Sequence, residues 1–101
     1  MGLRMEILPT VQAKANDAIL LHLGSWLDEK RGAAIQAEYG FATYCFGQEA
    51  YRFSVDYPVD WSVTTYSEAI ASVQQALRVA YPFLKEESIR RLSSCFSYAW
   101  K

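Results

Sequence analysis

Apolar side chains recur at four-residue steps over the first third of the chain, at Val11, Ala15, Ile19, Leu23 and Leu27. Polar positions such as Asn16 fall between them and are expected on the opposite side. This is the period of an amphipathic helix, so the pattern predicts a helix from Val11 to about Lys30. A second interpretation breaks this helix at Gly24 and starts a new one with Ser25 as its N-cap.

The period changes to two in the middle of the chain, where aromatic and β-branched residues occupy alternate positions: Tyr51, Phe53, Val55 and Tyr57. Such alternation is typical of a strand that buries one face, and Pro58 would end it. The stretch 41–46 predicts a second strand. Residues 47–49 between the two predict a short hairpin loop, in which Gly47 would supply an unusual backbone conformation.

Helical spacing returns in the last third of the chain. Thr65 and Glu68 have the spacing of a capping box, which marks a helix start. Pro82 predicts the end of that helix, and Glu86 lies in the first turn of a last one, where the helix dipole favours an acid. The apolar stripes of these two helices are expected at Ile70, Val73, Leu77 and Ala80, and at Ile89, Leu92, Phe96 and Ala99.

The fold class that follows is α+β, as a single two-layer domain over residues 1–101. It comprises an N-terminal helix, an antiparallel β-hairpin and two C-terminal helices. Two further stretches, 1–8 and 33–39, have enough apolar residues to add a third strand or to lengthen the hairpin. A hairpin alone is barely stable in water, so we expect it to pack against the helices.

Charge and apolar content argue against two classes of partner. The net charge is −1, and the aromatic stretch 41–66 has the single cation Arg52 against Glu49, Asp56 and Asp60. A phosphate backbone requires the opposite sign, so nucleic acid is an unlikely partner. No stretch is long and apolar enough to span a bilayer, and the start of the chain lacks a secretory pattern. We therefore expect a soluble protein of the cytoplasm.

Candidate chemistry is sparse, and we expect no cofactor and no metal. His22 is the only histidine, and Cys45 and Cys95 are far apart in sequence, which suits two buried thiols in a reducing compartment. Neither a nucleophile elbow nor a phosphate loop is present. Asp56 and Asp60 flank an aromatic segment and either form an acid–base pair of raised pKa or belong to a polar strand face and a turn.

Aromatic density is the most unusual property of the sequence. Eight of the fifteen aromatic residues fall between Tyr39 and Trp61. We interpret most of them as the inner face of the hairpin and the remainder as an interface. Tyr98 points about 160° away from Phe96 on a helix, so that ring also faces outwards. The residues we expect to bind a partner are Tyr51, Asp56, Tyr57, Asp60, Trp61 and Tyr98.

These features favour a small protein-binding module without catalysis, such as an immunity protein or an antitoxin-like or phage-encoded inhibitor. Such a protein needs shape and a few anchors rather than a catalytic motif. Two alternatives stay open. One is a homodimer or an accessory subunit of a larger assembly. The other is a small ligand-binding domain or enzyme whose pocket would use Asp56, Asp60, Tyr57 or His22.

Overall fold

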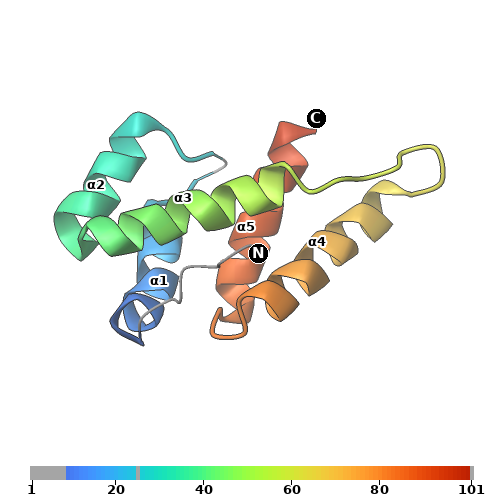
Figure 1. Cartoon of the computed structure of the whole chain (residues 1–101). Coiled ribbons are helices and arrows are strands. Elements are labelled where there is room, and N and C mark those ends of the chain that lie inside the picture. The colour runs from blue at the N-terminus through green and yellow to red at the C-terminus, as the bar shows by residue number, and fades with distance from the viewer. Residues whose placement is uncertain (1–8, 25, 101) are drawn as a thin grey trace, which may run out of the picture.

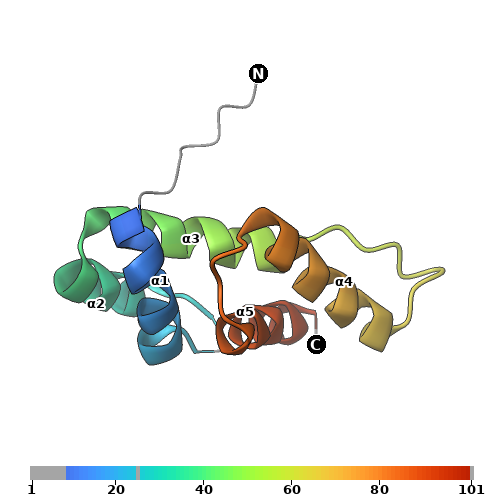
Figure 2. The ribbon, with the colours of Figure 1, turned by 90° about the horizontal axis from the view of Figure 1, so that it is seen from below.

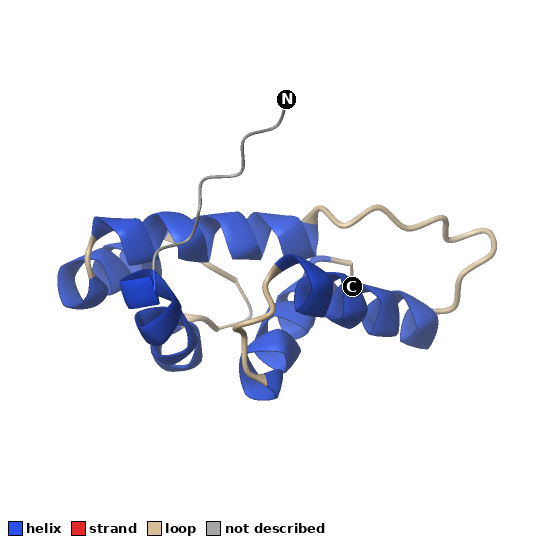
Figure 3. Ribbon diagram, turned by 60° about the horizontal axis from the view of Figure 1, so that its bottom comes forward, coloured by secondary structure: helices blue, strands red, loops and turns tan. Residues whose placement is uncertain are grey.

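The computed structural model describes residues 9–24 and 26–100, and over these residues every regular element is a helix (Figure 3). In chain order the helices are α1 (Pro9–His22), α2 (Glu29–Tyr39), α3 (Phe41–Val55), α4 (Tyr66–Ala80) and α5 (Glu86–Ala99). Helix α3 lies across α1 and α5, with α2 at one end of the molecule and α4 at the other (Figure 1). The predicted α+β fold is therefore wrong, because this part of the chain contains no strand.

The predicted hairpin is a single helix, α3. Its buried positions recur every three or four residues, at Thr43, Phe46, Gly47, Ala50 and Ser54. Most of these side chains are small or polar and do not stand out as an apolar stripe. The larger Tyr51, Phe53 and Val55 are only partly buried and flank that stripe. Tyr51 and Val55 lie on one border of the buried face of α3, and Phe53 lies on the other. This arrangement produces the alternation that predicted a strand.

Gly47, which was predicted in a hairpin loop, lies inside α3. Its substitution can therefore test whether α3 is one continuous helix. A Cβ atom built there would meet Ile35 Cδ1 of α2 at 3.9 Å, an ordinary contact distance. Alanine favours a helix interior over glycine by roughly 0.5–1 kcal/mol. We expect Gly47→Ala to raise the free energy of unfolding by about that amount, measured by urea denaturation followed by circular dichroism.

Gly40 is the matched control, since it joins α2 to α3 with φ at +94° and ψ at 167°. This region of backbone conformation is essentially restricted to glycine. Gly40→Ala should lower the free energy of unfolding by about 1–2 kcal/mol. A destabilised Gly47→Ala beside a tolerated Gly40→Ala would contradict a continuous α3.

The N-terminal prediction also needs correction, because two helices stand where one was expected from Val11 to about Lys30. Helix α1 ends at His22, and α2 begins after Asp28, whose side chain accepts the Arg31 backbone N–H at 2.8 Å. The break near Gly24 agrees with the second interpretation, but the N-cap is Asp28; Ser25 lies outside the described residues. The possible strand at 33–39 is part of α2, and the one at 1–8 falls outside the described residues.

The boundaries predicted for the two C-terminal helices are confirmed. Of the apolar positions predicted for them, Ile70 and Ala80 are only partly buried and Ala99 is exposed, whereas the other five are buried. Helix α4 starts with the Thr65–Glu68 capping box and ends before Pro82, and α5 starts at Glu86. Helix α4 packs on α5 through the stripe Ala69, Val73 and Leu77, all fully buried. In the view from below, the 56–65 loop extends beyond the far end of α3, and α4 runs back from this loop toward that end (Figure 2). None of the described helices has the length and apolar character to cross a membrane.

Candidate functional site

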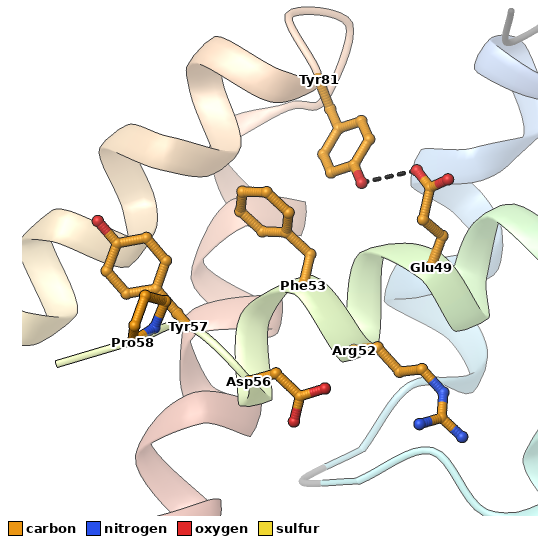
Figure 4. Close-up of a pocket in the computed structure, with 7 residues that line it drawn as sticks. All are labelled: Glu49, Arg52, Phe53, Asp56, Tyr57, Pro58 and Tyr81. Atoms are coloured by element: carbon orange, nitrogen blue, oxygen red, sulfur yellow. Dashed lines mark hydrogen bonds between the residues drawn. The ribbon is translucent and has the colours of Figure 1, made fainter. Parts of the chain in front are cut away.

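A groove runs between the C-terminal half of α3 and the outer side of α4. It consists of two neighbouring hollows, each of about 560 Å³. The first is lined by Glu49, Arg52, Phe53, Asp56, Tyr57, Pro58 and Tyr81 (Figure 4). The second is lined by Phe53, Tyr57, Ser72, Gln75, Ala76, Val79 and Ala80. Because both hollows share Phe53 and Tyr57, they form one continuous surface, which we call the α3–α4 groove.

Packed aromatic rings fix the shape of this groove. Tyr81 is buried, and its ring meets Phe53 edge-on at 5.6 Å and Phe46 at 5.2 Å. The Tyr81 hydroxyl donates a hydrogen bond of 2.7 Å to Glu49 Oε2, which holds that carboxylate at the rim (Figure 4). The centre of the Tyr57 ring lies 6.5 Å from the centre of the Phe53 ring. The rings are thus held in place by contacts within the chain.

The α4 wall of the groove is apolar and uncharged. Val79 is 72% exposed although it is a large aliphatic residue, and it lies between the small side chains Ala76 and Ala80. Ser72 and Gln75 complete this wall. Val79 thus extends the partly exposed rings of the groove by one apolar side chain.

The α3 wall of the groove is charged, with Glu49, Arg52 and Asp56 along it. Asp56 is the C-cap residue of α3. A carboxylate is unfavourable there, because the C-terminal end of a helix already has a partial negative charge. Helix stability therefore does not explain the choice of Asp56 at this position, which lies at the rim of the groove.

The structure brings together two of the predicted partner-binding residues, Asp56 and Tyr57, in the groove. Tyr51 is partly buried against the core instead. The sequence missed the rest of the lining, above all Val79 and Tyr81. Residues 69–77 of α4 have no charged side chain although one side of the helix must face outwards, a pattern that could have indicated the α4 wall but not Val79 itself.

Trp61 lies in a different place, at the free end of α5. Its ring stacks on Phe96 at 6.3 Å and on Tyr66 at 6.1 Å, and it lies 5.5 Å from Trp100. The Tyr66 hydroxyl donates a 2.9 Å hydrogen bond to the Ser97 carbonyl. Trp61 therefore acts as a cover over the buried Phe96, and not as part of the groove.

The Asp60 carboxylate forms hydrogen bonds within the turn that precedes the rings around Trp61. It accepts hydrogen bonds from the hydroxyl and from the backbone N–H of Ser62, the latter at 3.0 Å. These bonds, the hydroxyl first, hold the pKa of Asp60 below its usual value. The alternative of an acid of raised pKa is therefore wrong for Asp60, which stays ionised at neutral pH.

Tyr98 meets another aromatic ring of the same chain. It is 47% exposed and packs on Trp26 at 5.1 Å. The Arg31 guanidinium lies 5.3 Å from the centre of the Trp26 ring, on its face. Tyr98 is thus a boundary ring on a surface separate from the groove lining.

The remaining reactive side chains form local structural contacts. The buried Cys95 thiol donates to the Gly24 carbonyl at 3.3 Å, and burial raises its pKa to about 11. The thiol is therefore protonated at neutral pH and unsuited to nucleophilic attack. His22 Nε2 lies 2.8 Å from Glu38 Oε2. Within the described residues, no group of three or more His, Cys, Asp or Glu side chains could hold a metal ion.

Comparisons with models of protein families, with curated proteins and with solved structures found no match to this chain. The function is therefore inferred from the geometry of the groove. Preformed rings, an exposed aliphatic side chain and a charged rim are the typical components of a protein-docking surface.

Proposed function

We propose that this chain is a protein-binding module without catalysis of its own, and that its α3–α4 groove takes a segment of another protein. The main support is that Phe53 and Tyr57 join two hollows into one surface with the exposed Val79 beside it. An inhibitor that covers the active surface of a partner fits this arrangement. Cys45 and Cys95 are both free thiols, which suits the cytoplasm as the compartment.

The chemistry of the described residues favours protein binding over catalysis and over binding to a phosphate backbone. An enzyme needs a titratable group poised near neutral pH, whereas the pKa of Asp60 is lowered and that of Cys95 is raised. A binder of phosphate backbones needs a basic lining, whereas Glu49 and Asp56 outnumber Arg52 here.

The proposal predicts that groove variants lose the partner and remain folded. Val79→Glu places a charge on the apolar wall, and Tyr57→Ala removes a shared ring. We expect each variant to recover the partner at least about tenfold less well, since a central apolar anchor contributes more than about 1.4 kcal/mol to an interface. The measurement is affinity capture of the tagged protein from its native lysate, quantified by mass spectrometry.

Leu21→Glu is the matched control, because Leu21 is 62% exposed on α1 and does not line the groove. It should recover the partner as well as the unaltered chain does. Equal recovery by Val79→Glu and Leu21→Glu would exclude the groove as the binding surface. A dimer of this chain that Val79→Glu dissociates would instead favour the homodimer alternative.

A further inference from the structure

We propose that the groove takes a short amphipathic helix with basic residues along the flank that faces α3. This inference rests on the proposed function and names the chemistry of the partner. Three properties of the groove support it: its walls have few hydrogen-bond partners for an extended backbone, its α4 wall has a row of small side chains, and its charges lie on the α3 wall.

The walls of the groove favour a partner that satisfies its own backbone. Most of the lining comes from α3 and α4, whose interior N–H and C=O groups are bonded within each helix. None of the described residues forms a strand edge that could pair with an extended chain. The lining is mainly aromatic and aliphatic, and Ser72 and Gln75 are the polar groups of its α4 wall. An extended segment would leave buried N–H and C=O groups unpaired, whereas a helix pairs its own.

The shape of the α4 wall also suits a helix. Ser72, Ala76 and Ala80 are spaced four residues apart and thus lie along one row of α4. This row spans about 12 Å, or roughly two helical turns. Phe53 and Tyr57 border this row on one side. Because the side chains of the row are small, a ridge of side chains from an incoming helix can pack against it.

Charge complementarity sets the polarity of the partner. Glu49 and Asp56 are seven residues apart on α3, which places them two turns, or about 10 Å, apart on one wall. Arg52 offsets part of their charge, and the opposite wall has none. Basic side chains spaced about two turns apart on a partner helix would therefore meet the two carboxylates.

The experiment is a selection of displayed peptides of about 16 residues, a length at which an isolated helix is marginally stable. Half of the library has an alanine-rich helical frame, and half has the same frame broken by a central proline. Flank positions are Lys or Glu in both halves. The library is selected on the full chain and counter-selected on Val79→Glu.

We expect the helical frame to be recovered at least about tenfold over the proline frame, because proline disrupts a helix interior. Lys should be preferred over Glu on the flank. Selected peptides should bind Asp56→Asn about two- to fivefold more weakly, the range of an exposed ion pair. Asp17→Asn, an exposed aspartate of α1 that does not line the groove, should bind them unchanged.

Other outcomes separate this inference from the proposed function. If proline-broken or Glu-flanked peptides are preferred and still depend on Val79, the groove binds protein segments but the basic helix is wrong. If no peptide depends on Val79, both the basic helix and the groove as a peptide site are overturned. Equal binding to Asp56→Asn and Asp17→Asn would overturn the charge assignment.

Discussion

Replacing Asn16 by leucine is expected to lower the free energy of unfolding by about 2–4 kcal/mol. Asn16 is buried on α1, and its Oδ1 accepts the Lys85 backbone N–H at 2.8 Å and the Ser88 hydroxyl at 2.7 Å. Its Nδ2 donates to the Phe83 carbonyl at 3.2 Å. Leucine has a similar branched shape but would leave the buried Ser88 hydroxyl and the two part-buried backbone groups without this partner.

This effect is large because Asn16 binds the start of α5 and the turn before it. The N-cap residue of α5 is Lys85, and its side chain makes no capping hydrogen bond. Asn16, on another helix, accepts the backbone N–H of Lys85 and the Ser88 hydroxyl, and so connects α1 to the turn between α4 and α5. Urea denaturation of Asn16→Leu, monitored by circular dichroism, measures the loss.

Ser88→Ala is the graded control, since it removes one of the three partners of Asn16 and leaves the other two bonds in place. It should cost about 1 kcal/mol, the typical net contribution of one hydrogen bond. If Asn16→Leu lowered the free energy of unfolding no more than Ser88→Ala does, the Asn16 hydrogen bonds would not be what holds α1 to α5.

Asn16 also shows which parts of the fold periodicity can predict. The apolar stripe of α1 was predicted from spacing, and Val11, Ala15, Ile19 and Leu23 are indeed buried. Asn16 was expected on the polar side because it is an amide. Its burial depends on partners almost seventy positions later in the chain, and local patterns hold no information about such contacts.

The strand prediction failed for a related reason. Gly47, Ala50 and Ser54 form the buried side of α3, where small side chains fit close to neighbouring elements. A search for apolar repeats gives weight to large side chains, and here the large ones flank the contact. Capping chemistry was more reliable, because the Thr65–Glu68 box acts within one turn and needs no tertiary partner.

The groove was predictable only in part. Asp56 and Tyr57 were predicted because they place a charge beside an aromatic ring. Two adjacent residues keep that arrangement in any fold that exposes them. Val79 and Tyr81 join the same surface because the C-terminal part of α4 comes near the C-terminal half of α3, an arrangement that became visible with the structure. Trp61 was predicted from the aromatic segment and Tyr98 because it points away from Phe96, but both lie outside the groove, packed on Phe96 and Trp26 respectively.

Phe96→Ala is expected to cost about 3–5 kcal/mol of stability, the range for removing a buried aromatic ring. Phe96 is fully buried on α5, within the core formed with α4. It lies 6.3 Å from both Trp61 and Trp100, so its loss would open a cavity beneath those rings. The measurement is urea denaturation followed by tryptophan fluorescence, which also reports greater exposure of the two indoles.

Trp61→Ala is the informative counterpart, because Trp61 is 38% exposed and covers Phe96 from outside. It should cost about 1–2 kcal/mol, less than loss of the buried ring, since part of its area already contacts water. It should also leave partner capture through the groove unchanged, in contrast to Tyr57→Ala. A Trp61→Ala variant that stays fully stable but loses the partner would move the binding surface from the groove to the end of α5.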